Sequence, residues 1–284
     1  MATDNHYTIR RLNRAELDTV FQWSASEGWN PGLCDGDSFY AADPGGFFGG
    51  FMGEELIGSV SAVAYDPHYG FIGLYIVKPG FRGQGYGIAL FQAALDYLGD
   101  RTIGLDGVVE RQADYARSGF TAVYRNVRFR HVASGQPSLA KGVVPLAEIP
   151  FDAVARYDEA LHPAPRQAFL SHWLAQSGTV ALAKQEAGRL AGYGVIRQAK
   201  DGHRIGPLFA DEADSARQLF LGLCAAVEPG SPVFWDVPEI NSQAVALARS
   251  LDMEMVFEAA RMYKGAAPAL PMARIFGTTT LELG

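Results

Sequence analysis

The sequence predicts an α/β (α+β) protein made of two similar units in tandem. Short apolar segments of strand length alternate with segments of helical spacing along both halves of the chain. The second half repeats a series of short matches to the first half, in the same order, at an offset of about 133 residues. A length of 284 residues is enough for two ordinary domains. We therefore expect a duplicated α/β unit.

The first half contains a full set of predicted elements. Asn13 is suited to cap a helix that carries Leu17, Val20 and Phe21 on one stripe. Residues 27–46 are dense in glycine and proline and are expected to form a loop. Further helices are predicted at residues 88–95 and 113–118, and strands at residues 7–12, 47–51, 56–65, 69–77, 102–106 and 121–130.

Four short matches define the repeat. Individually each is weak, but their common order indicates a duplicated unit. We therefore predict domains at residues 1–132 and 145–284, joined by a linker at residues 133–144 that is rich in polar and small residues. The matches pair residues 53–58 with 187–192, 72–74 with 205–207, 105–108 with 235–238, and 116–118 with 248–250.

The composition restricts the partners and the setting. A net charge of -7 argues against a nucleic acid or an anionic membrane as partner. The chain has no run of about 18 apolar residues and no signal-peptide pattern at residues 1–6, which favours a cytoplasmic protein. Two isolated cysteines and scattered histidines predict no metal site. A homo-oligomer is compatible with this composition.

A glycine-rich loop lies between the strand at 69–77 and the helix at 88–95. Amides at a helix start have no internal partner and carry the positive end of the helix dipole, so they favour an anion. Glycines let the backbone approach phosphate oxygens, and Arg82 adds a charged donor. The Walker lysine is missing and G-x-G-x-x-G does not fit, which disfavours a nucleoside triphosphate and NAD. The loop reads Arg82-Gly83-Gln84-Gly85-Tyr86-Gly87 and follows Val77-Lys78-Pro79.

With this loop after a strand that ends in Val-x-Pro, the chain resembles the GNAT superfamily of N-acetyltransferases. Over its whole length it looks like tandem GNAT proteins with a divergent second unit, a likeness that extends to the terminal Glu282-Leu283-Gly284. The resemblance implies a mixed, mostly antiparallel sheet flanked by helices in each unit, and acetyl-CoA as co-substrate. The implied pantetheine contacts are Ile76 and Val77, and the implied pyrophosphate contacts are Arg82, Gly83, Gln84, Gly85, Tyr86 and Gly87.

The resemblance also implies a general acid. Tyr115 stands four residues before Gly119-Phe120, where family members place a tyrosine that faces the CoA sulfur. A phenol with a pKa near 10 is able to protonate a thiolate at neutral pH. The strand at 69–77 lacks the glutamate that many relatives carry, so the general base stays open between Glu27, Asp43, Asp106 and a water chain. The oxyanion donor is expected to be a backbone amide of residues 75–77.

The long loop is the expected acceptor site, because it carries aromatic residues that a solvated linker does not need. The second half is expected to shape this pocket at the domain junction, with Trp173, Trp235, Arg197 and Arg204 as candidate lining. Its own loop at 210–217 has three acidic residues and no glycine, so CoA is not expected there. Asn241 is expected to cap a helix, with a pantetheine contact as the alternative. The predicted acceptor residues are Glu27, Trp29, Asn30 and Tyr40.

The sequence therefore predicts an acetyl-CoA-dependent N-acetyltransferase. The acceptor is expected to be the primary amine of a small molecule or an amino acid, attacked directly without a covalent enzyme intermediate; a protein amine is the alternative acceptor. A different class of function is a non-catalytic acyl-CoA sensor or interaction module on the same fold.

Overall fold

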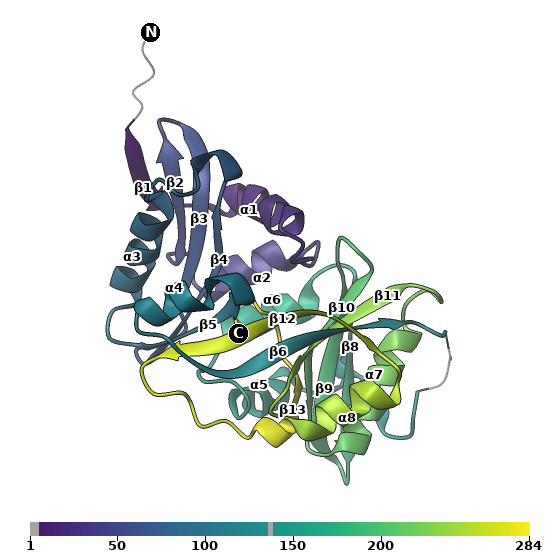
Figure 1. Ribbon diagram of the computed structural model, residues 1–284. Helices are drawn as coiled ribbons and strands as arrows, with labels where there is room; N and C mark the ends of the chain where they lie inside the picture. Colours follow the sequence, from purple (N-terminus) through teal and green to yellow (C-terminus); the bar gives the residue numbers. More distant parts are fainter. Residues whose placement is uncertain (1–5, 136–138) are drawn as a thin grey trace.

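The computed structural model describes residues 6–135 and 139–284, and in these ranges thirteen strands form one sheet with helices on both faces (Figure 1). Residues 1–5, at the start of the first predicted domain, and residues 136–138, within the predicted linker, lie outside the described ranges. The predicted α/β class is confirmed: most strand pairs are antiparallel, and each half contains one parallel pair.

The first half forms the predicted elements. Its first helix begins at Asn13, whose side chain accepts from the amide of Glu16 while Glu16 accepts from the Asn13 amide. The helices are α1 (Arg14–Ser26), α2 (Asp35–Ala42), α3 (Tyr86–Leu98) and α4 (Gln112–Arg117), and the strands are β1 (Tyr7–Arg11), β2 (Phe47–Met52), β3 (Glu55–Ala64), β4 (Tyr69–Val77), β5 (Thr102–Val108) and β6 (Thr121–Val132).

The second half repeats this order, and the predicted repeat is confirmed. The β2–β3 hairpin recurs as β8–β9, β4 recurs as β10, and β5 recurs as β11. A further strand, β7, starts inside the predicted linker. The strands are β7 (Val143–Pro145), β8 (Thr179–Glu186), β9 (Arg189–Gln198), β10 (His203–Ala210), β11 (Pro232–Pro238), β12 (Glu254–Lys264) and β13 (Ile275–Gly277), and the helices are α5 (Phe151–Glu159), α6 (Gln167–Ala175), α7 (Ala213–Ala225) and α8 (Ser242–Ser250).

One prediction for the first half is wrong. The segment 27–46 is not a continuous loop, because it contains α2. The helix has no side-chain cap at Cys34, so its local signal is weak. Tertiary packing supplies the stability instead: Phe39 is fully buried and its ring stacks on Trp173 of α6 at 6.4 Å. Burial of a large apolar face thus outweighs poor helix propensity here.

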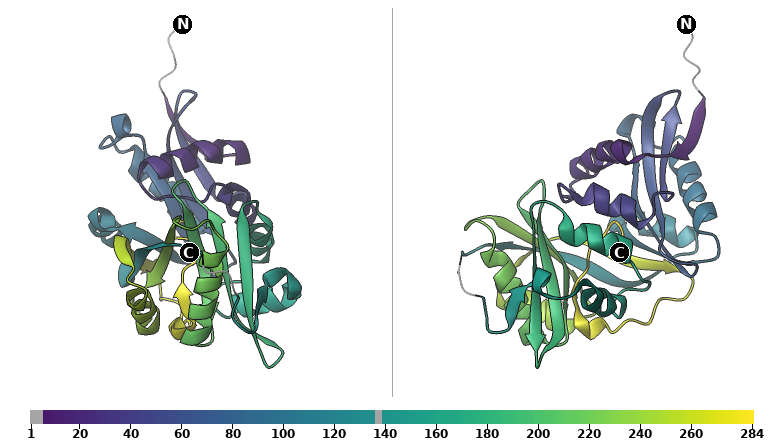
Figure 2. Two further views of the ribbon diagram at one scale, coloured as in Figure 1. Left: turned by 90° about the vertical axis from the view of Figure 1, so that its right-hand side faces the viewer. Right: turned by 180° about the vertical axis from the view of Figure 1, so that it is seen from behind.

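The two halves exchange their last strands. The sheet order is β1-β2-β3-β4-β5-β12-β6-β11-β10-β9-β8-β7. Strand β12 of the second half therefore lies between β5 and β6, and β6 of the first half pairs with β11. In Figures 1 and 2, β6 and β12 cross the middle of the molecule between the two groups of strands. The predicted domain boundary at residue 132 thus separates the two halves in sequence. The sheet does not divide there, because the last strand of each half pairs with the other half.

The first unit is covered on both faces by helices. Helices α1 and α2 lie on one face of β1–β4, and α3 lies on the other (Figure 2). The α1/α2 face belongs to a core that both halves build, with Leu17, Phe39 and Leu74 packed in the same cluster as Phe169 and Tyr193. The α3 face has its own cluster. The α1/α2 face therefore points toward the second half.

Each unit has a gap between its two parallel strands. Strand β4 pairs with β5 only over residues 69–72, yet β4 continues to Val77 and β5 to Val108. Strands β10 and β11 likewise pair only over residues 203–205. In the second unit β13 fills this gap: it pairs with β10, and the Thr278 amide donates to the Asp236 carbonyl oxygen of β11 at 3.0 Å. Among the described residues, no strand fills the gap of the first unit.

Asn241 has the predicted capping role. Its side-chain oxygen accepts from the amides of Gln243 and Ala244, both at 3.1 Å, at the start of α8. Its amide nitrogen donates to the carbonyl oxygens of Ile275, at 3.0 Å, and Ala273, at 3.3 Å. The residue therefore binds the chain's own β13 segment in the second unit's gap.

We expect Asn241→Ala to destabilise the protein by roughly 2–4 kcal/mol without weakening acetyl-CoA binding. The substitution removes a helix cap, worth about 1 kcal/mol, and leaves a buried carbonyl without its donor. Urea unfolding measures the first effect and calorimetric titration measures the second. Asn13→Ala, which removes an exposed cap, is the control and should cost about 1 kcal/mol. Weaker acetyl-CoA binding at unchanged stability would instead place a pantetheine contact at Asn241.

A second expectation concerns the strand exchange. Residues 1–132 expressed alone should not form a stable domain, because β5 loses β12 and β6 loses both of its neighbours. Co-expression with residues 139–284 should restore a folded, two-fragment complex. Thermal unfolding followed by circular dichroism measures both. A cooperative transition of the isolated 1–132 fragment, near the temperature of the whole protein, would show that the exchange is dispensable.

Candidate active site

The glycine loop forms an open cradle at the start of α3. Gly83 and Gly85 adopt φ values of 76° and 89°, which side-chain-bearing residues rarely adopt. A Cβ added at Gly80, Gly83 or Gly85 would meet nothing within 4 Å, so the loop backbone faces open space. Helix α3 has no side-chain cap and no acidic residue in its first turn. Its N-terminal amides are therefore available to an anion such as a pyrophosphate.

Neighbouring side chains hold the loop in this shape. Arg82 donates through Nε to the Val77 carbonyl oxygen at 2.7 Å and also pairs with the carboxylate of Glu27, just after α1. Gln84 donates to the Gly80 carbonyl oxygen at 3.1 Å. Gly87 is required for close packing, because a Cβ there would lie 2.6 Å from the Tyr75 hydroxyl. The Tyr86 ring lies 4.7 Å from that of Tyr7. The predicted phosphate residues thus lie together.

The gap beside this loop begins at a bulge in β4. The β3–β4 register shifts between Ser59 and Ser61, and Leu74 adopts a φ of 44°. The Ser59 hydroxyl fixes the bulge by donating to the Leu74 carbonyl oxygen at 2.8 Å. Beyond Ile72 β4 no longer pairs with β5, so one backbone edge of residues 73–77 faces the gap. Val77 is half-exposed at its end, whereas the Ile76 side chain is buried in the sheet.

Tyr115 lies on the other side of this gap. Its ring packs against Phe91 of α3 and Phe120, with centroids 5.7 and 6.4 Å away. The ring also lies over Gly107 of β5, where an added Cβ would be 2.9 Å from it. Burial, with a smaller contribution from Tyr75, raises the pKa of the Tyr115 phenol well above its ordinary value. The phenol therefore stays protonated beside the gap at neutral pH.

The predicted acceptor residues do not form one pocket. Glu27 pairs with Arg82 just beyond the end of α1, while Tyr40 lies beside Arg14 at its start. Those two ends are roughly 20 Å apart in a helix of 13 residues. Asn30 exchanges two hydrogen bonds with the backbone of Asp201, both 2.8 Å, and so attaches the loop to the β9–β10 turn. The Trp29 carbonyl oxygen accepts from Arg128 at 2.7 Å.

The candidate bases each have partners. Asp43 accepts from two backbone amides and from the Tyr97 hydroxyl. Asp106 accepts from Nε and Nη2 of Arg261, at 3.0 and 2.8 Å, and from the Asn126 side-chain amide at 2.8 Å. Burial nevertheless raises the pKa of Asp106, because desolvation outweighs the attraction of Arg261. None of the three predicted carboxylates, Glu27 included, is free of a cation or a structural donor.

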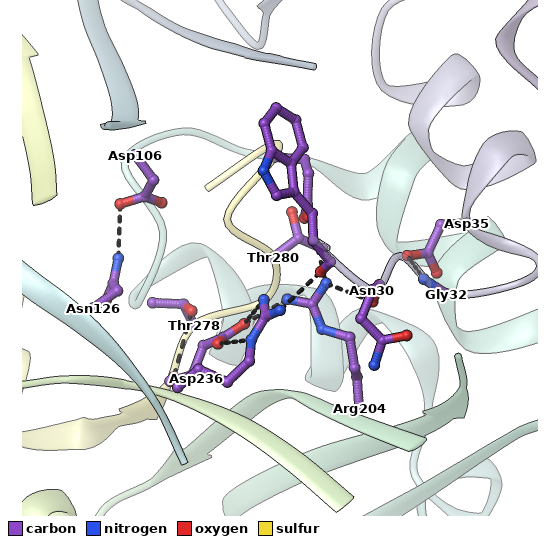
Figure 3. A network of polar contacts seen from close by, with 12 residues as sticks. Asn30, Gly32, Asp35, Asp106, Asn126, Arg204, Asp236, Thr278 and Thr280 are labelled. Carbon is purple, nitrogen blue, oxygen red and sulfur yellow. Dashed lines mark hydrogen bonds and ion pairs between the residues drawn. The ribbon is translucent and has the colours of Figure 1, made fainter. Parts of the chain in front are cut away.

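A buried polar network joins the long loop to the second half, because Arg204 binds Asp236 and also donates to the Asn30 carbonyl oxygen at 3.3 Å (Figure 3). Arg128 binds Asp236 through two nitrogens at 2.7 and 3.0 Å, and Arg204 binds the same carboxylate at 2.5 Å. Burial alone would raise the pKa of Asp236, but the two guanidinium groups hold it well below its usual range. Arg197 binds Asp35, whose carboxylate also accepts from the Gly32 amide at 2.9 Å. The Arg128–Asp236 and Arg197–Asp35 pairs cross the junction between the halves, whereas Arg204–Asp236 lies within the second half.

The four second-half residues that were candidates to line the acceptor pocket have other roles in the structure. Trp173 and Trp235 are fully buried in the two core clusters, and the Arg197 guanidinium lies 4.3 Å from the Trp173 ring centroid. Arg197 and Arg204 act as ion-pair partners of the long loop and of β11. The partners Asp35 and Asp236 come from distant parts of the sequence, so no local pattern could pair them.

The segment after β13 contacts the first unit, which the sequence does not predict. Residues 278–283 are buried and run from the second unit onto β4 of the first. A Cβ at Gly73 would lie 1.9 Å from the Glu282 carbonyl oxygen, and Tyr65 donates to the Leu283 carbonyl oxygen at 2.9 Å. Leu283 packs in the α1/α2 core. The available signal in the sequence was Gly73 itself, since a glycine inside a buried strand often marks a close backbone approach.

None of the helices in residues 6–135 and 139–284 is both long enough and apolar enough to span a bilayer. Within the same ranges, no three His, Cys, Asp or Glu side chains are grouped so that they could hold a metal ion.

Comparisons with known proteins agree with this geometry. The Acetyltransferase (GNAT) family matches residues 10–120, and an Acetyltransferase (GNAT) domain matches residues 154–277. The chain is 31% identical, over 278 residues, to the holothin acyltransferase of a Pseudoalteromonas strain, covering 98% of this chain and 95% of that protein.

Solved structures show the same fold. A putative acetyltransferase of Pyrococcus horikoshii superposes with a TM-score of 0.83 at 22% identity, covering 98% of this chain and 96% of that one. A tandem GNAT protein from the clavulanic acid biosynthesis pathway gives a TM-score of 0.64 at 16% identity, covering 93% and 100%. With two matched domains and a relative that aligns along nearly its whole length, the chain belongs to the GNAT acetyltransferase family as a tandem member and an acyltransferase.

Proposed function

We propose that the protein transfers the acetyl group of acetyl-CoA to a primary amine of a small molecule or an amino acid, at one site in the first unit. The observation that carries the proposal is the gap between β4 and β5, which begins where their pairing ends and runs along β4 toward the uncapped N-terminus of α3. The pyrophosphate would bind the amides around Gly83 and Gly85, and the pantetheine would lie along residues 73–77 of β4.

The second unit supports a single site. Its gap is filled by β13, and the start of its equivalent helix α7 carries carboxylates. Asp211 and Asp214 lie at that helix start, and Asp211 is already paired with Arg274. Negative charge beside a pyrophosphate would repel it. Acetyl-CoA is therefore assigned to the first unit alone.

Tyr115 is proposed as the general acid. Acetyl transfer by direct attack requires a proton for the CoA thiolate as the thioester C–S bond breaks. Tyr115 borders the gap and holds its proton through the neutral range, because burial raises its pKa. The name of the Pseudoalteromonas relative supports acyl transfer, and holothin is therefore one acceptor to assay.

Arg82→Ala should weaken acetyl-CoA binding about tenfold or more, since a hydrogen bond to a charged group is worth about 1.5–3 kcal/mol. Calorimetric titration with acetyl-CoA gives the dissociation constant. Arg130→Ala is the matched control, because Arg130 is exposed on β6 and has one loose contact with Glu254 at 3.8 Å. Unchanged affinity in Arg82→Ala would remove this side chain from the phosphate site.

Tyr115→Phe should lower kcat about 10²-fold while acetyl-CoA affinity stays at the wild-type value, because only the proton donor is lost. With the pKa of Tyr115 raised by burial, the wild-type enzyme should keep this acid protonated into the mildly alkaline range. Release of free CoA, followed against pH, measures both. Tyr97→Phe, which removes a hydroxyl bound to Asp43, is the control. A Tyr115→Phe enzyme with wild-type kcat would rule out this role.

A further inference from the structure

Glu282 is a buried carboxylate with one oxygen left unsatisfied. Its residue is 5% exposed. Oε1 lies 3.4 Å from Nη1 of Arg204, and Oε2 has no hydrogen-bond partner among the described residues. Burying a carboxylate oxygen without a donor is costly, so such a group in a native protein calls for an explanation, such as a catalytic role or a bound water or ion. The oxygen therefore marks a place where a donor is missing.

The position of Glu282 relates it to the gap. Its carbonyl oxygen is packed on Gly73, which is the first residue of β4 beyond the last pair with β5. Leu283, the next residue, packs in the α1/α2 core. Glu282 therefore lies where the gap opens onto the α1/α2 face, opposite the face that carries α3 and the glycine loop. An acyl group that enters from the α3 side would emerge toward this residue.

Among the buried carboxylates around this junction, Glu282 has fewer hydrogen-bond donors than Asp236, Asp35 or Asp106. Asp236 is held by Arg128 and Arg204, and Asp35 is held by Arg197 through two nitrogens. Asp106 is held by Arg261 and Asn126. Each of these three carboxylates accepts hydrogen bonds on both of its oxygens. Glu282 has a single long contact, and its second oxygen has no donor among the described residues.

A second buried acceptor lies on the same face of the sheet. Asn126 precedes Arg128 by two residues on β6, so both side chains point to one side. The Asn126 side-chain nitrogen donates a hydrogen bond to Asp106, and its Oδ1 has no partner among the described residues. A primary ammonium group has three N–H donors and no acceptor. Two buried oxygens without donors, on Glu282 and Asn126, suit that donor set.

We propose that Glu282 receives a proton from the acceptor amine; this inference rests on the proposed function. An acceptor that arrives as R–NH₃⁺ gives one proton to Oε2 of Glu282. The freed lone pair forms the N–C bond to the thioester carbonyl carbon, and the C–S bond breaks as the carbonyl re-forms. The thiolate takes the proton of Tyr115, and the tyrosinate recovers a proton from the new amide nitrogen. Glu282 then returns its proton to solvent.

The test compares two classes of nucleophile with the full-length Glu282→Gln enzyme. The alkylamines 2-phenylethylamine, ethanolamine and L-lysine, together with holothin, form one panel, while hydroxylamine is largely unprotonated at neutral pH and needs no base. We expect kcat/KM for the alkylamine that the wild type acetylates best to fall about 10²-fold or more at neutral pH. The deficit should narrow as the pH rises toward the pKa of the amine. Transfer to hydroxylamine should stay close to the wild-type rate.

Glu258→Gln is the matched control, because Glu258 lies on β12 with an exposed ion pair to Arg125 and should behave as wild type. Calorimetric titration with acetyl-CoA verifies that both variants keep the cofactor site. Equal loss with alkylamines and hydroxylamine would mean that Glu282 is structural, and wild-type rates with both would mean that it has no part in transfer. If the wild-type enzyme binds acetyl-CoA but acetylates no amine of the panel, the proposed function itself is contradicted.

Discussion

The pairing of β6 with β12 is the interaction on which the rest of the structure depends. It runs antiparallel from Glu254 to Tyr263 and joins the two halves into one sheet. The exchange places Arg261 of the second half opposite Asp106 of the first, and Arg128 of the first half opposite Asp236 of the second. Each pair is buried. Removing one partner of a buried pair destabilises a protein far more than removing one partner of an exposed salt bridge does. The exchange thus makes the two halves mutually dependent.

The same sheet contains one gap in each unit, and the chain itself fills only the gap of the second unit. In both units a short parallel pairing ends at a bulge, at Leu74 in β4 and between Ile205 and Leu208 in β10. In the second unit β13 supplies the backbone partners that the diverging strands lack. In the first unit the backbone edge of β4 beyond the bulge remains open beside a helix start without acidic residues. Unpaired backbone in a half-buried gap needs a partner, and an extended, amide-bearing ligand such as pantetheine would be one.

The sequence predicts the features that depend on residues close together along the chain. The repeat, the β2–β3 hairpin, the Asn13 cap and the glycine loop all follow from local spacing or turn chemistry, and the structure contains each of them. Helix α2 was missed because its stability comes from Phe39 against Trp173, a contact across the two halves. The strand exchange was missed because period-two patterning assigns a strand but not its partner. The predicted acceptor residues were chosen by type, and residue type does not reveal that Asn30 binds the backbone of Asp201.

The path of the C-terminal segment gives the second unit a role even though its own gap is filled. The segment leaves β13, passes Gly206 of β10, and reaches Gly73 of β4. A Cβ at Gly206 would lie 2.3 Å from the Thr279 carbonyl oxygen, so both bulged strands need glycine for the same reason. Filling the second gap thus fixes the start of the segment, and Arg204 and the α1/α2 core fix its end. Under the proposed function, a duplicated cofactor site has become the anchor that positions a carboxylate at the remaining one. A change in the second unit would then alter acceptor chemistry in the first without contacting acetyl-CoA.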